Sequence, residues 1–135
     1  MYAADEEETR YSIEMQKENE YNIPKRSRYY QGTMDLDLID KGMPYDSLRK
    51  NIVIFICTFD YFRQGRHKYT FVNTCIENPD LYFGDETEKI VLNTKGTLDD
   101  VDEEMLEFLA YVESSTDAVA DASKSSLVKE LHKTV

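Results

Sequence analysis

The chain has 135 residues, two cysteines and a formal net charge of −11. This length fits one ordinary domain. A hydrophobic fraction of 41%, with ten Tyr and six Phe, is enough for a core and excludes global disorder. No apolar run reaches the roughly 18 residues of a membrane span, and "MYAADEEETR" lacks the features of a signal peptide. We therefore expect a cytoplasmic protein with no membrane partner.

The charge is unevenly distributed along the chain. Its acidic total argues against indiscriminate nucleic-acid binding, because phosphate attraction needs cations. Yet residues 17–31 hold four basic and two acidic side chains, and residues 49–68 hold five basic and one acidic. Residues 80–107 hold ten acidic and two basic side chains. Two short segments could thus attract phosphate within a chain that repels it as a whole.

The first predicted element is a hairpin whose second strand is "RYSIEMQ", residues 10–16. Side chains alternate along a strand, so Tyr11, Ile13 and Met15 are predicted to face the core. The polar residues Ser12, Glu14 and Gln16 then lie on the opposite face. The polar side is either an ordinary solvated face or a metal site, because a hard cation such as Mg²⁺ takes oxygen ligands. The first strand, "MYAA", is too short for good pairing, so we expect the domain to extend further N-terminally.

A helix is predicted over residues 27–41, after the break at Pro24. Tyr30, Met34 and Leu38 form one apolar stripe at helical spacing. Arg28 and Gln31 lie three residues apart and share a face. That face is either solvated or turned toward the strand that carries Glu14.

Three more strands are predicted, of which "NIVIFICTF" (residues 51–59) is a buried central strand. "HKYTFVN" alternates as a strand with one wet face, and "KIVLNT" is short. Cys57 and Cys75 fall in these apparent strands without CxxC spacing, so we expect two buried free thiols. The basic loop "RQGRHK" suits a solvated turn at least as well as a phosphate contact.

A second helix is predicted over residues 99–113, with an apolar stripe of Val101, Met105, Phe108, Leu109 and Val112. The helix dipole explains the acids of its first turn, "DDVDEE", without a metal. The two histidines, at 67 and 132, lack partners at ligand spacing. Residues 114–135 are expected to form a Ser/Ala/Asp-rich linker and the start of a C-terminal helix.

Several ordered blocks together resemble one family. "YSIEMQ", "RSRYYQGTMDLDLIDKGMPYDSLRKNIVIFICTFDYF", "GRHKYTFVN" and "IVLNTKGTLDDVDEEMLEFLAYV" look like the PD-(D/E)XK nuclease family transposases, the recombination-promoting nucleases of bacteria. The resemblance implies an α/β, restriction-endonuclease-like core, with a mixed central sheet flanked by helices. Residues 1–113 would be a partial nuclease domain, incomplete at the N-terminus.

The resemblance also implies a site. Glu14 and Gln16 match the Glu-x-Gln of this branch, so Glu14 and the main-chain carbonyl of Met15 would ligate Mg²⁺. Gln16 would orient water or hold a phosphate oxygen. An amide lacks the charge of the usual lysine, and Arg28 is the expected substitute, with Gln31 as a polar support. The implied reaction is hydrolysis of a DNA phosphodiester.

One departure from the family pattern is severe. The family has an aspartate at the end of the strand before the Glu strand, in a context like Leu-Asp-Val-Tyr. Tyr2 falls at that tyrosine, so the aspartate would come directly before Met1. We therefore expect weak activity or none. The alternative is a non-catalytic interaction module, in which the N-terminal sheet edge pairs with a second copy. Because an unpaired edge invites such association, we expect a homodimer under either hypothesis.

Overall fold

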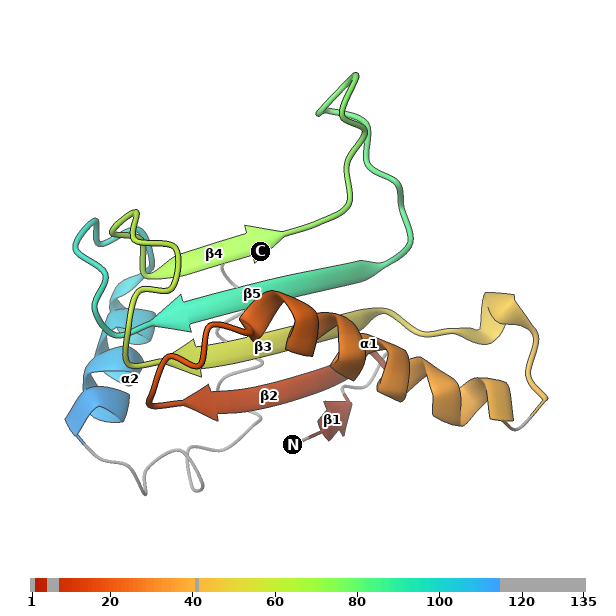
Figure 1. Ribbon diagram of the computed structural model, residues 1–135, viewed down its shortest axis with the longest axis horizontal. Coiled ribbons are helices and arrows are strands. Elements are labelled where there is room, and N and C mark those ends of the chain that lie inside the picture. Colours follow the sequence, from red (N-terminus) through yellow and green to blue (C-terminus); the bar gives the residue numbers. More distant parts are fainter. Residues whose placement is uncertain (1, 5–7, 41, 115–135) are drawn as a thin grey trace. The chain divides into compact units, whose positions relative to one another are not determined.

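The structure is a computed structural model that describes residues 2–4, 8–40 and 42–114 (Figure 1). Met1 and the expected C-terminal helix, within 115–135, lie outside the described residues. The strands are β1 (Tyr2–Ala4), β2 (Arg10–Gln16), β3 (Asn51–Cys57), β4 (Lys68–Phe71) and β5 (Thr87–Asn93). The helices are α1 (Ile23–Asp40), α2 (Glu103–Ser114) and a short 3-10 helix, Tyr45–Ser47. None of the described helices is long and apolar enough to cross a membrane.

The chain divides into two compact units. The first unit comprises Met1–Glu14, Glu20–Phe55 and Thr70–Ile90, and the second comprises Met15–Asn19, Ile56–Tyr69 and Val91–Val135. Helix α1 belongs to the first unit and α2 to the second. Strands β2, β3 and β5 each run from the first unit into the second.

The strands form one mixed sheet in the order β1-β2-β3-β5-β4 (Figure 1). Strand β1 pairs antiparallel with β2. Strands β2 and β3 are parallel, because Arg10 N bonds Lys50 O at one end and Thr58 N bonds Gln16 O at the other. The same reasoning makes β3 and β5 parallel and β4 antiparallel to β5. The predicted α/β class, with a mixed sheet and packed helices, is confirmed.

The parallel register places residues of β2 and β3 side by side. Arg10 lies beside Asn51, and steps of two residues bring Glu14 beside Phe55. Because neighbouring residues in a ladder point to the same face, Glu14 shares the face of Asn51 and Phe55. Helix α1 covers this face in the first unit, with the Tyr30 and Phe55 ring centroids 6.2 Å apart.

The environment of β2 differs from the prediction, and in the first unit helix α1 covers the face that carries Glu14. The side of Ser12, Glu14 and Gln16 is not a solvated face: Ser12 is fully buried, and the other two are half-buried. Tyr11 and Ile13 are buried on the opposite side, as predicted, whereas Met15 is only half-buried. A strand next to a fully buried parallel strand has both faces covered, so period-two alternation was a poor guide here.

Helix α1 begins at Ile23, four residues before the predicted start. Pro24 does not break it, since a proline in the first helical turn loses no hydrogen bond that the turn would make. The buried positions are Ile23, Ser27 and Gln31, whereas Tyr30 and Met34 of the predicted stripe are only half-buried. The side chain of Leu38 lies outside the described residues.

The two cysteines differ in environment. Cys57 is fully buried at the end of β3, and burial raises the pKa of its thiol to about 12. Cys75 is partly exposed and lies in the segment between β4 and β5, so its predicted burial in a strand is wrong. Both are free thiols, as expected.

Thiol labelling tests this difference, because the thiolate is the nucleophile. In the folded protein at mildly alkaline pH, we expect a thiol-specific chromogenic reagent to titrate Cys75 alone. Denaturant should release the second thiol. Cys75→Ser should leave no reactive thiol until the chain unfolds, and rapid labelling of Cys57 in that folded variant would contradict the burial.

Helix α2 begins at Glu103 rather than at residue 99. Asp102 caps it, because its Oδ1 accepts the Met105 N–H at 2.8 Å. Asp99 has a positive φ of 48°, which is incompatible with a right-handed helix. Met105, Leu109 and Val112 of the predicted stripe are buried.

Candidate active site

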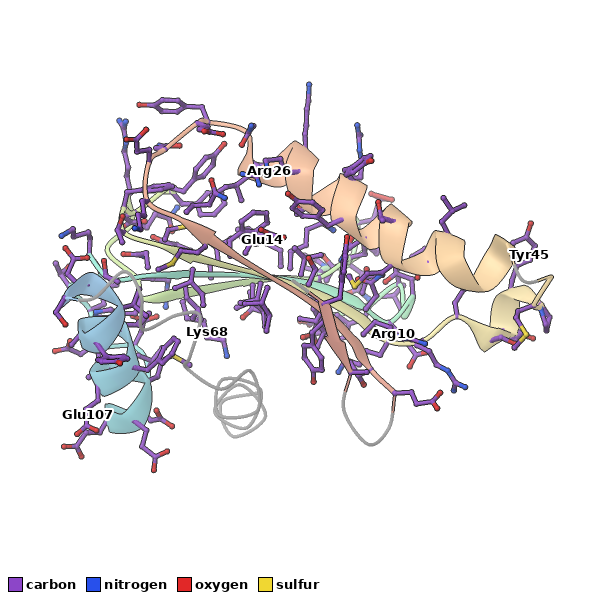
Figure 2. All side chains as sticks on the ribbon, turned by 90° about the horizontal axis from the view of Figure 1, so that it is seen from below. Arg10, Glu14, Arg26, Tyr45, Lys68 and Glu107 are labelled. Atoms are coloured by element: carbon purple, nitrogen blue, oxygen red, sulfur yellow. The ribbon has the colours of Figure 1, made fainter. Side chains whose placement is uncertain are left out.

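Glu14 lies half-buried on β2, on the face that α1 covers (Figure 2). Tyr2 pairs with Ser12 across the β1–β2 ladder and so reaches the same face. The pKa of Tyr2 is raised, first by partial burial and then by the negative charge of Glu14. This coupling places the Glu14 carboxylate and the Tyr2 hydroxyl in one electrostatic environment.

Arg26 is the cation of this region that sequence reasoning missed. Its Nη2 donates to the Tyr30 hydroxyl at 2.8 Å, and its Cζ lies 5.5 Å from the Tyr30 ring centroid and 5.8 Å from that of Phe55. Since Phe55 adjoins Glu14 in the ladder, the guanidinium is held near the Glu14 carboxylate (Figure 2). The i, i+4 spacing of Arg26 and Tyr30 was the available signal.

The N-terminal end of α1 is electropositive. Its first turn contains no acidic residue, while Lys25, Arg26 and Arg28 lie in its first six positions. The helix dipole and the unpaired N–H groups of a first turn also favour anions. Glu18 and Glu20, in the preceding turn, reduce the local charge. The three basic side chains still outnumber these two acids, so the local charge favours binding of a phosphate group.

The structure places Arg28 and Gln31 in different environments. Arg28 is exposed, whereas Gln31 is 9% exposed. The Gln31 Nε2 donates to the Glu88 carbonyl at 3.1 Å, and the Gln31 carbonyl accepts from Asn51 Nδ2 at 3.0 Å. Gln31 therefore ties α1 to β5 and β3, and its amide is engaged in holding the helix on the sheet.

Stability measurements distinguish these two residues. We expect Gln31→Ala to lower the free energy of unfolding by about 1–3 kcal/mol, because the part-buried Glu88 carbonyl loses its donor. Arg28→Ala, on the same helix, should change it by no more than about 0.5 kcal/mol. Urea denaturation of both variants checks this, and equal losses would contradict the assignment.

Met15 and Gln16 follow Glu14 on β2 and belong to the second unit. The Gln16 Nε2 donates to the Met15 carbonyl at 3.0 Å. In the same unit, the Thr58 N–H bonds the Gln16 carbonyl, and the Thr58 hydroxyl bonds that of Lys17 at 2.8 Å. The end of β2 is thus anchored to β3, and a carbonyl oxygen with two lone pairs can accept the Gln16 amide and still face a cation.

The donors at this strand suit a hard cation only in part. Glu14 supplies a carboxylate and Met15 a carbonyl, and Mg²⁺ prefers such oxygen ligands. Within the residues that the structure describes, no group of three His, Cys, Asp or Glu side chains could hold a metal. The strand therefore offers one carboxylate where the resemblance implies two.

Two acidic side chains beside β4, Asp60 and Asp100, accept backbone N–H groups. Asp100 accepts the N–H of His67 at 2.6 Å and that of Lys68 at 3.2 Å. Asp60 organises the basic loop, accepting the Gly65 N–H and the Tyr69 hydroxyl at 2.8 Å each. These hydrogen bonds give Asp60 a structural role in the loop at residues 63–68, as the residue that holds the turn together.

The pKa of Asp100 is lowered. Desolvation acts to raise it, but the His67 and Lys68 backbone N–H groups outweigh that effect. A carboxyl group with a depressed folded-state pKa stabilises the fold above its unfolded pKa, about 3.9. That stabilisation is lost as the pH falls through the folded value.

We therefore expect Asp100→Asn to be less stable than the parent by about 1–3 kcal/mol near neutral pH, because the amide nitrogen faces a backbone N–H. The difference in the free energy of unfolding between the parent and Asp100→Asn should disappear as the pH falls below about 4 and Asp100 is protonated. Urea denaturation across this range measures it. Asp80→Asn, in an exposed turn, is the matched control, and a gap that persists in acid would oppose the assignment.

The mixed sheet and its packed helices are consistent with a restriction-endonuclease-like α/β core, in which the strand that carries Glu14 borders a buried parallel strand. The family model for PD-(D/E)XK nuclease family transposases matches residues 1–115, and the chain belongs to this family. The family is one of nucleases, which act on DNA and typically use a divalent metal ion. No curated protein and no solved structure matches the chain.

Proposed function

We propose that this chain carries a metal-binding carboxylate of a DNA phosphodiesterase site, Glu14, and cleaves DNA weakly. The observation that carries this is the position of Glu14, held on a half-buried strand face beside Phe55 and under a basic helix end. Family membership supports the reaction class.

Each residue has a distinct role in this proposal. The Glu14 carboxylate and the Met15 carbonyl would hold Mg²⁺. A divalent cation there would supply Lewis-acid charge to the scissile phosphate and lower the pKa of a water. The Gln16 amide would orient that water or a phosphate oxygen.

Arg26 is the stronger candidate for the missing lysine's charge. Its guanidinium is fixed by the Tyr30 hydroxyl and two aromatic rings, so little side-chain entropy is lost when it contacts a phosphate. Arg28 is exposed at the same helix end and would contact the DNA backbone further along. Gln31 would act indirectly, by holding α1 on the sheet.

The β1 register supports a position for a second carboxylate in this proposal. Tyr2 lies opposite Ser12 and Ala4 opposite Arg10, so each step back along β1 is one step forward along β2. A residue joined directly before Met1, in the same strand, would come opposite Glu14. Such a residue would complete the pair of carboxylates that a hard-cation site prefers.

Nicking of supercoiled plasmid with Mg²⁺ or Mn²⁺ tests the proposal. We expect weak nicking that falls about 10²-fold in Glu14→Gln, the scale of losing one electrostatic stabiliser. Gln16→Ala and Arg26→Ala should also be slower. Glu107→Gln, the same chemical change on α2, is the matched control.

An N-terminal extension tests whether a second carboxylate opposite Glu14 increases the nicking rate. A chain extended by Leu-Asp before Met1 should nick faster than one extended by Leu-Asn, and Glu14→Gln should abolish the gain. Equal background in every variant would reject catalysis and support the alternative, a non-catalytic interaction module.

A further inference from the structure

The segment between β4 and β5, residues 72–86, forms an ordered hairpin that projects from the sheet (Figure 1). Thr74 and Tyr82 form an antiparallel bridge. Phe83 N bonds Asn73 O at 2.9 Å, and Cys75 N bonds Leu81 O at 3.0 Å. We call this segment the 72–86 hairpin.

Large apolar side chains are exposed on this hairpin and at the end of β4. Ile76 is 91% exposed and Phe83 is 79% exposed. The full set is Phe71, Val72, Ile76, Leu81, Tyr82 and Phe83. Monomeric proteins rarely expose a contiguous apolar patch of more than a few hundred Å², so a cluster of this kind indicates an interaction surface.

The neighbouring strand β4 is an edge of the described sheet. Because Asn93 N bonds His67 O, alternation turns the backbone groups of Tyr69 toward β5 and those of Thr70 away from it. Thr70 therefore presents its N–H and C=O at the open side of the strand. Such an edge is a template for pairing with another strand.

Charge changes sign across β4. Residues 63–68 contain Arg63, Arg66 and Lys68 and no acid. The 72–86 hairpin contains Glu77, Asp80, Asp85 and Glu86 and no Lys or Arg. A basic segment thus leads into the strand and an acidic segment leads out of it.

We propose that the β4 edge binds a second copy of this chain, with the two β4 strands antiparallel about a two-fold axis at Thr70. Antiparallel pairing brings residues that precede β4 in one copy beside residues that follow it in the other. Residues 63–68 would then lie along the start of the partner's 72–86 hairpin, and the contact would occur twice. Parallel pairing would place like charges together instead.

This surface differs from the N-terminal edge at β1. Strand β1 has three residues, and Tyr2 is its one large exposed apolar side chain. The β4 edge combines an open strand, an apolar cluster and self-complementary charge. The dimer does not depend on nuclease activity.

Sedimentation velocity over a range of concentrations is the first test. We expect a reversible dimer that Ile76→Asp and Thr70→Pro dissociate. Thr70→Val retains the outward N–H and should still dimerise. Tyr45→Asp, which alters another highly exposed aromatic residue, is a control for added surface charge and should leave the dimer intact.

Charge reversal separates a specific contact from general destabilisation. Arg63→Glu and Glu77→Arg should each raise the dimer dissociation constant about tenfold or more. The double variant should recover most of the affinity. Far-UV circular dichroism confirms that each variant is folded.

Disulfide trapping in a Cys75→Ser background tests which edge of the sheet, β4 or β1, forms the dimer. Thr70→Cys should yield covalent dimers on mild oxidation, whereas Tyr2→Cys should not. Efficient trapping through Tyr2 alone would overturn the proposal and assign the dimer to β1. A monomer at every concentration would also overturn it.

Discussion

Burial of strand β3 is the constraint on which the rest of the structure depends. All seven of its residues are buried, and β2 and β5 pair with it on either side. Because side chains alternate with a period of two, a one-residue slip of β2 would turn Glu14 to the opposite face and remove Tyr11 and Ile13 from the face on which they are buried. The hydrophobic ladder therefore sets the orientation of the candidate catalytic residue.

Hydrogen bonds of buried polar side chains hold helix α1 on the sheet. Asn51 opens β3 as a buried polar residue, and its Nδ2 reaches the Gln31 carbonyl and Asp35 Oδ1. With Gln31 bound to Glu88, these bonds tie the middle of α1 to β3 and β5. Holding α1 there in turn holds its basic first turn, with Arg26, near Glu14. Helix α1 thus carries the hydrogen bonds to the sheet in its middle and the basic residues that could bind phosphate at its N-terminal end.

The acidic composition is largely explained by local backbone bonding and solvated segments. Asp60, Asp100 and Asp102 accept backbone N–H groups in turns and at a helix cap. Glu14 is a half-buried carboxylate on the strand that the family motif matches. The net charge of −11 therefore describes the surface and the turns, while DNA binding would depend on a short basic helix end.

The sequence by itself determined the α/β class, the buried central strand and three of the five residues of the predicted α2 stripe, Met105, Leu109 and Val112. These depend on hydrophobic runs, helical periodicity and ordered residue blocks, which are local properties of the chain. The tertiary structure alone decided that α1 starts at Ile23, that Ser12 is buried and that Arg26 rather than Arg28 lies against Phe55. It also decided that Gln31 serves the fold and that Cys75 is partly exposed. Each of these outcomes depends on contacts with residues distant in sequence, and local pattern carries no information about which partner covers a given face.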